Sequence, residues 1–164
     1  MAENFQIIGK STDRVDGIDK VTGRAKYAGD IIVPGMVAGK FLRSPYAHAR
    51  IHSIDTKEAE AVPGVVTILT SKDLTGLNPF MRSEKRKDHP ILAMDRALFA
   101  GQPVAAVAAV DELAAEEALA KIHVQYEVLP AVITVREAMA QGASLVHSFA
   151  PDNLCFKDHL EKGD

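Results

Sequence analysis

One stretch, residues 103–129, constrains the fold more than any other part of the chain. It opens with Pro103–Val110, a run of small and β-branched residues with no polar interruption. Gly101 and Pro103 at its entry disfavour a helix at this point. We therefore predict a central strand, packed closely under a helix.

The predicted helix follows at once, over about residues 111–122. Asp111 is suited to be its N-cap, and acidic residues such as Glu112 favour the positive end of the helix dipole. Apolar residues recur on one face at helical spacing: Ala115, Ala118, Leu119 and Ile122. Residues 123–129 then alternate apolar and polar side chains, which predicts a strand with one face in solvent.

Shorter elements are predicted on both sides of this stretch. Strands are expected over residues 36–42, 49–55 and 65–70, although Ile51 and Ile54 break strict alternation in the second. Short helices are expected over residues 56–62, which end at Pro63-Gly64, and over residues 135–141, which end at Gly142. Residues 71–96 are irregular and are predicted to contain an exposed loop.

These elements predict an α+β fold with a mixed sheet, one well-formed helix and one or two short helices. A length of 164 residues fits a single domain, residues 1–164. Within it we expect an irregular lead-in over 1–23, a core over 24–150 and the start of a linker over 151–164. The last residues lack a cap or an apolar anchor, which suggests that the sequence has been cut from a longer one.

Charge and cysteine content limit the partners. With 19 basic and 22 acidic residues the net charge is −3, so no general attraction to nucleic acid or anionic lipid is expected. Cys155 is the only cysteine, which excludes an internal disulfide or an iron–sulfur cluster within this chain. No signal peptide or membrane-spanning run is recognisable, and the expected location is the cytoplasm.

Four strings, in order, resemble the start of the large subunit of the xanthine dehydrogenase and aldehyde oxidase family. They are Gly9–Asp30, Leu42–Ile51, Pro63-Gly64-Val65 and Phe99–Val107. The resemblance covers about residues 8 to 164, and the ordered set is specific although each string alone is weak.

The resemblance implies that the fold is an α/β hammerhead and that the molybdenum–pterin cofactor is bound by a region downstream of it. The complete enzyme would hydroxylate or dehydrogenate an aldehyde, a purine or another heteroaromatic compound, with electrons leaving through iron–sulfur and flavin (FAD) centres. The implied partners are that downstream region and the iron–sulfur and flavin subunits or domains. The family's cofactor-contacting and catalytic residues have no counterpart here, so we assign no catalytic, cofactor-binding or metal-binding residue to this chain.

The candidate site residues are instead interface candidates. Arg43 and His48 flank a turn fixed by Pro45 and could supply hydrogen bonds at a domain or subunit contact, as could their neighbours. Gln102 stands in a rigid Gly-Gln-Pro turn, where its amide is expected to cap backbone groups, with contact to a ligand as the alternative. The full set of candidates is Arg43, Ser44, Tyr46, His48 and Gln102.

Other functions remain possible on the sequence alone. Ser44 and His48 could form a nucleophile and base in a small hydrolase, although no orienting carboxylate or strained elbow accompanies them. His48 and His52 are four residues apart, but in an extended segment that spacing separates them too widely for a metal site. A free-standing small-molecule binding module is a further alternative, and the basic residues between 82 and 87 could dock an acidic partner.

Overall fold

A computed structural model of the chain describes residues 7–77, 79–80 and 88–163. The chain divides into two compact units, Met1–Met36 and Val37–Asp164. The basic residues between 82 and 87 lie outside the described residues.

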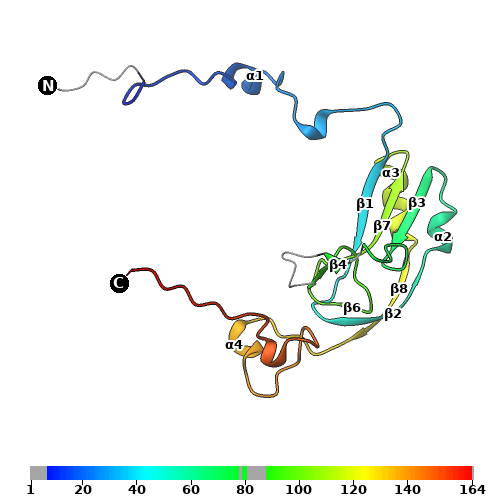
Figure 1. Cartoon of the computed structure of the whole chain (residues 1–164). Coiled ribbons are helices and arrows are strands. Elements are labelled where there is room, and N and C mark those ends of the chain that lie inside the picture. The colour runs from blue at the N-terminus through cyan, green and yellow to red at the C-terminus, as the bar shows by residue number, and fades with distance from the viewer. Residues whose placement is uncertain (1–6, 78, 81–87, 164) are drawn as a thin grey trace. The chain divides into compact units, whose positions relative to one another are not determined.

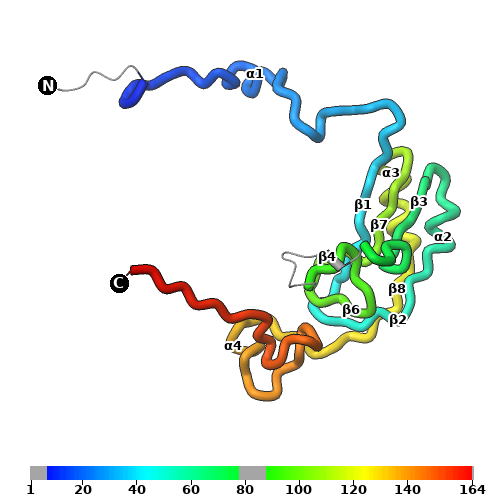
Figure 2. The backbone as a smooth tube through the Cα atoms, viewed as in Figure 1, coloured from blue at the N-terminus to red at the C-terminus, as the bar shows by residue number. Residues whose placement is uncertain are grey.

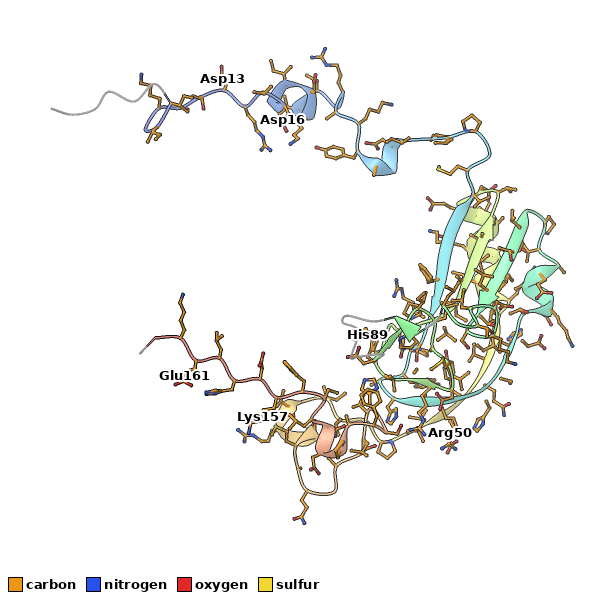
Figure 3. All side chains as sticks on the ribbon, viewed as in Figure 1. Asp13, Asp16, Arg50, His89, Lys157 and Glu161 are labelled. Carbon is orange, nitrogen blue, oxygen red and sulfur yellow. The ribbon has the colours of Figure 1, made fainter. Side chains whose placement is uncertain are left out.

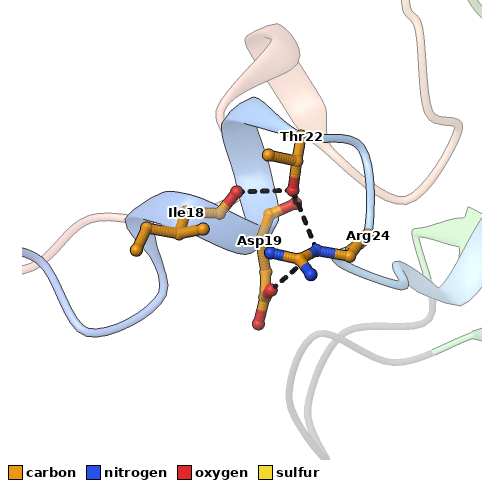
Figure 4. A network of polar contacts seen from close by, with 4 residues as sticks. All are labelled: Ile18, Asp19, Thr22 and Arg24. Carbon is orange, nitrogen blue, oxygen red and sulfur yellow. Dashed lines mark hydrogen bonds and ion pairs between the residues drawn. The ribbon is translucent and has the colours of Figure 1, made fainter.

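The N-terminal segment, residues 7–36, is shaped by local hydrogen bonds. It contains a short helix, α1 (Gly17–Val21), and one 3-10 turn, η1 (Ala28–Asp30), so its first part is less irregular than predicted. The backbone carbonyl of Asp19 accepts the amides of Arg24 and Ala25 at 2.8 and 2.9 Å. The Thr22 hydroxyl donates to the Ile18 carbonyl at 2.6 Å and accepts from Arg24 at 3.2 Å (Figure 4).

These contacts hold the segment without a hydrophobic core. Every residue from 7 to 36 is exposed except Gly17 and Ala25, which are half-buried. Large apolar side chains such as Ile18 and Ile32 are among the exposed ones, and charged side chains such as Asp13 and Asp16 alternate with them (Figure 3). The shape of this segment therefore comes from polar contacts between near neighbours.

The second unit contains two three-stranded sheets and a short ladder. In the first sheet, β7 runs between β1 and β3 (Figure 1). In the second sheet, β2 runs between β6 and β8. The first sheet is built from β1 (Ala38–Arg43), β7 (Pro103–Ala109) and β3 (Val65–Thr70). The second is built from β6 (Arg96–Ala97), β2 (Ala49–Asp55) and β8 (His123–Val128), and the ladder from β4 (Pro79–Phe80) and β5 (His89–Pro90).

The predicted α+β class is confirmed, with a difference in the sheet. All pairings between the described strands are antiparallel, in two small sheets rather than in one sheet of mixed direction. The predicted central strand is confirmed as β7, but the strand that follows the helix, β8, joins the other sheet. The physical reason is that β1 and β3 occupy both edges of β7, so β8 pairs with β2 instead.

The long helix is confirmed as α3 (Glu112–Ala120). Asp111 is its N-cap, and the carboxylate accepts the Ala114 amide at 2.8 Å. One face of α3 packs on the first sheet, where alanines of the helix meet alanines of β7. The core of buried side chains consists of Ala59, Val62, Ala105, Val107, Ala109, Ala114, Ala115, Ala118 and Ile122. Because alanine projects only a methyl group, helix and strand can approach closely.

Gly64 allows the chain to turn from the short helix α2 (Lys57–Glu60) into β3 beside this core. Its φ is +90°, and its carbonyl accepts the Val110 amide at 2.8 Å. A Cβ at this position would lie 2.8 Å from Cγ2 of Val110 and 3.3 Å from Cβ of Ala114. Both the conformation and the space therefore require glycine.

The chain after β8 forms a loop that is tied together by one side chain. The helix α4 (Val135–Ala138) ends earlier than predicted, and Gly142 has the expected positive φ of +76°. The Asn153 amide donates to the carbonyls of Ala138 and Ser144 at 2.9 and 3.0 Å, and its oxygen accepts the Val146 amide at 2.8 Å. Asn153 belongs to the final 3-10 turn, η2 (Pro151–Asn153). Among the helices of the described residues, none is long and apolar enough to cross a membrane.

Candidate functional site

The interface candidates gather where β1 leaves the first sheet and the chain turns toward β2, a path that Figure 2 follows. The backbone of this turn is joined to the turn that precedes β7. The Ser44 amide donates to the Gln102 carbonyl at 2.9 Å, and the Gly101 amide donates to the Ser44 carbonyl at 2.8 Å. We refer to Arg43, Ser44, Tyr46, His48 and Gln102 as the polar corner.

Ser44 is 2% exposed, and its hydroxyl is used to shape the turn. The hydroxyl donates to the Tyr46 carbonyl at 3.0 Å and accepts the Tyr46 amide at 3.1 Å. Both bonds connect residues two positions apart, which is the usual way in which serine stabilises a turn after a strand. The Ser44 hydroxyl thus bonds to the backbone of the turn just beyond β1, where the hydrogen bonds between strands have ended.

Gln102 is 1% exposed and has a similar role on the facing turn. Its side-chain oxygen accepts the Leu98 amide at 2.6 Å, and its own backbone amide donates to the Phe99 carbonyl at 3.2 Å. A buried amide of this kind has to satisfy backbone groups that no strand reaches. This agrees with the predicted capping role of Gln102.

His48 connects the turn to the end of β8. Its Nδ1 lies 2.8 Å from the Pro130 carbonyl oxygen, and its own carbonyl accepts the Leu129 amide at 2.9 Å. Because a carbonyl oxygen can only accept, Nδ1 carries the proton in this contact. Nε2 is buried and has no protein hydrogen-bond partner among the described residues.

Arg43 and Tyr46 are the exposed members of the polar corner. The Arg43 guanidinium donates to the Gly101 carbonyl at 2.8 Å and lies 5.7 Å from the centre of the Phe41 ring. The Tyr46 ring meets the Tyr126 ring edge-on, with centroids 5.2 Å apart. Burial raises the pKa of the Tyr126 phenol, and a hydrogen bond with Ser44 opposes that effect.

This geometry does not assemble a nucleophile and its base. The Ser44 hydroxyl is bonded to the backbone of Tyr46, and the imidazole of His48 is oriented by a backbone carbonyl rather than by a carboxylate. A catalytic serine needs its hydroxyl bonded to a base that a third group orients. The polar corner therefore has the chemistry of a structural joint with two exposed side chains.

The histidines are not grouped as metal ligands within the described residues, which contain no cluster of three His, Cys, Asp or Glu side chains suited to an ion. His52 lies on the extended strand β2, and its Nε2 is 3.1 Å from the Glu127 carboxylate. Arg50 on the same strand also lies 3.1 Å from that carboxylate.

A hollow of about 240 Å³ is lined by charged residues that the sequence analysis did not single out. Asp88, Arg96 and His147, which belongs to the loop after α4, are among its lining residues. Burial lowers the pKa of His147, and the charge of Asp88 opposes that shift. His147 is far in the sequence from Asp88 and Arg96, and the three follow no recognised motif, so only the folded chain reveals their proximity.

Comparison with known proteins identifies the fold. Residues 22–130 match the family described as aldehyde oxidase and xanthine dehydrogenase, a/b hammerhead domain. The large chain of carbon monoxide dehydrogenase from Afipia carboxidovorans is 39% identical over 93% of this chain and 19% of its own length. A probable xanthine dehydrogenase chain from Bacillus subtilis is 41% identical over 96% of this chain and 21% of its own length.

Solved structures of related enzymes have the same fold as this chain. The aldehyde oxidoreductase from Desulfovibrio desulfuricans superimposes with a TM-score of 0.79 at 32% identity, over 88% of this chain and 17% of that one. The chain spans about a fifth of the length of the carbon monoxide dehydrogenase and probable xanthine dehydrogenase chains. The chain belongs to the aldehyde oxidase and xanthine dehydrogenase family, of which it contains the α/β hammerhead domain.

Proposed function

We propose that this chain is the non-catalytic hammerhead part of the large subunit of a molybdenum-dependent hydroxylase or dehydrogenase. It supports the region that binds the molybdenum–pterin cofactor, and the chemistry takes place in that region. Relatives named as a xanthine dehydrogenase molybdenum-binding subunit and a nicotinate dehydrogenase large molybdopterin subunit support the assignment to such a large subunit.

The observation that carries the proposal is that the buried side chains of the polar corner form hydrogen bonds within the domain. Its three buried members, Ser44, His48 and Gln102, bond to the backbone of the domain itself. Groups engaged in this way stabilise a fold, and they are not free to bind or convert a substrate. Arg43 and Tyr46 remain available at the surface for contact with another domain or subunit.

The assembly partners follow from the same proposal. Residues 151–164 lead into the downstream molybdenum-cofactor region, and the iron–sulfur and flavin (FAD) subunits or domains accept the electrons. A cytoplasmic location is consistent with the single cysteine, Cys155.

The test is complementation between two parts of the large subunit, produced with the other subunits of the enzyme. One part is this chain, and the other is the remainder of the subunit. We expect this chain alone to bind no molybdenum and oxidise no substrate, and the two parts together to recover metal content and activity that the remainder alone lacks. Stoichiometric metal on this chain, or full activity of the remainder without it, would contradict the proposal.

A further inference from the structure

The first sheet has one face covered by α3 and a second face, here called the open face, that is buried at Val104 but open beside Ala106 and Ala108. Alternate residues of β7 point to opposite faces, and Ala105, Val107 and Ala109 point to α3 in the core. Ala106 and Ala108 point to the other face, where they are only half-buried. A central strand with apolar residues on both faces is typical of a sheet that is covered on both sides.

The strand register places two rows of side chains across this open face. Ala106 pairs with Phe41 on β1 and with Leu69 on β3. Ala108 pairs with Gly39 and Thr67 in the same way. These residues border an apolar groove of about 200 Å³ on the sheet.

The groove has the shape of a trough. Its floor consists of the small side chains of β7, and the larger Phe41 and Leu69 form its walls. Phe41 is 47% exposed, and the Arg43 guanidinium lies near its ring at 5.7 Å. An apolar centre with an aromatic side chain and an arginine beside it is typical of a surface that another protein part covers.

We infer that the trough, defined by Phe41, Leu69, Ala106 and Ala108, is the surface on which the downstream part of the same large subunit packs. This inference rests on the proposed function and names the surface that performs it. The relatives extend the large subunit to about five times the length of this chain, so most of that polypeptide is available to cover the trough.

The chemistry of the trough favours this occupant over others. A permanent contact within one polypeptide is more apolar than a contact between subunits that associate reversibly, and covalent connection raises the local concentration of the occupant. A second copy of this chain fits poorly, because two troughs placed face to face would leave their alanine floors unfilled.

The first experiment identifies the occupant in the assembled enzyme. A photoreactive phenylalanine analogue replaces Phe41 in one variant and Leu69 in another, and the cross-linked peptides are sequenced by mass spectrometry. We expect both positions to react with one stretch of the same subunit beyond residue 164. A cross-link to residues 1–163 or to another subunit, or no cross-link, overturns the inference.

The second experiment uses a matched pair of charge substitutions in the full-length large subunit. Ala108→Arg places a charge on the trough floor, and Leu113→Arg places one on α3 at a side chain that is 76% exposed. We expect Ala108→Arg to lower the yield of assembled large subunit at least tenfold relative to Leu113→Arg, while circular dichroism finds both variants of the 164-residue chain equally folded. Equal yields overturn the inference, and so does a trough variant that is unfolded by itself.

The outcomes separate this inference from the proposed function. If complementation succeeds while the cross-links lead elsewhere, the trough assignment fails and the supporting role stands. If complementation fails, the proposed function fails with it.

Discussion

The Nδ1 atom of His48 lies 2.8 Å from the carbonyl oxygen of Pro130, so that one side chain joins the turn after β1 to the end of β8. We predict that His48→Ala lowers the free energy of unfolding by about 1–3 kcal/mol, because the variant loses this hydrogen bond and the packing of a buried ring. His48→Asn should show only part of that loss, since its amide nitrogen can replace Nδ1. Chemical denaturation measures both, and His52→Ala on the exposed face of β2 is the control. Equal losses for His48→Ala and His52→Ala would contradict this role.

A methyl group at Gly64 should destabilise the domain. Gly64→Ala forces an alanine into a φ of +90° and places its Cβ 2.8 Å from Cγ2 of Val110. We expect a loss of about 1–3 kcal/mol in the free energy of unfolding. Gly76→Ala is the matched control, because Gly76 has a φ of +81° but open space around it. The difference between the two variants in thermal or chemical unfolding measures the steric contribution, and no difference would refute it.

Asn153 should be more important than its place near the end of the chain suggests. Asn153→Ala removes three hydrogen bonds and forces alanine into a φ of 56°. Asn153→Gly removes the same bonds without the backbone strain. We expect faster amide hydrogen exchange over residues 138–146 in both variants and a larger effect for alanine. Unchanged exchange in both would mean that the loop is held by other contacts.

Glu137 should make the loop around α4 sensitive to acid. Its carboxylate accepts the backbone amides of Ile133 and Thr134, which holds its pKa below the usual value. A lowered folded-state pKa contributes stability that is present above the unfolded-state pKa and is lost as pH falls through the folded-state pKa. Nuclear magnetic resonance titration of Glu137 should find this lowered pKa, and Glu137→Gln should remove the acid dependence of amide protection at residues 133–138. A pKa at or above the usual glutamate value would disprove it.

The N-terminal segment should contribute little to the stability of the second unit. Residues 7–36 contain no buried residue, so a chain that begins at Val37 loses no core. We expect its thermal midpoint to stay within a few degrees of that of the whole chain. A fall of about ten degrees or more, measured by circular dichroism, would indicate that the segment packs on the sheets.

The local elements were predictable where one pattern is continuous. The apolar run of β7 and the N-cap at Asp111 depend on neighbours in the sequence, so propensity and capping identify them. The interrupted alternation of Ile51 and Ile54 has a structural cause, because the pairing of β2 with β8 shifts between Ile51 and Ser53. The sequence pattern indicated an irregularity in this strand, but it did not show that the cause is a shift in strand pairing.

The arrangement of the sheets was not predictable in the same way. Which strand pairs with β7 depends on contacts between residues far apart in the sequence, such as Ala38 with Ala109, and no local signal encodes them. The polar corner was found by residue type, but the burial of Ser44 and Gln102 follows only from the long-range pairing of their turns. Tyr126 and the Pro130 carbonyl were missed because they come from a distant strand end.

The alanine layer between α3 and β7 limits how this domain can vary over evolutionary time. Ala115 and Ala118 on the helix, and Ala105 and Ala109 on the strand, carry the smallest side chain that an L-residue with a Cβ can have. Where a larger residue at one of these sites faces another alanine, that alanine can be reduced only to glycine, which weakens helices and strands. Substitutions at these alanines other than to glycine can therefore only enlarge the side chain, which widens the distance between α3 and β7. A lineage that accepts such a substitution must move the whole helix away from the sheet.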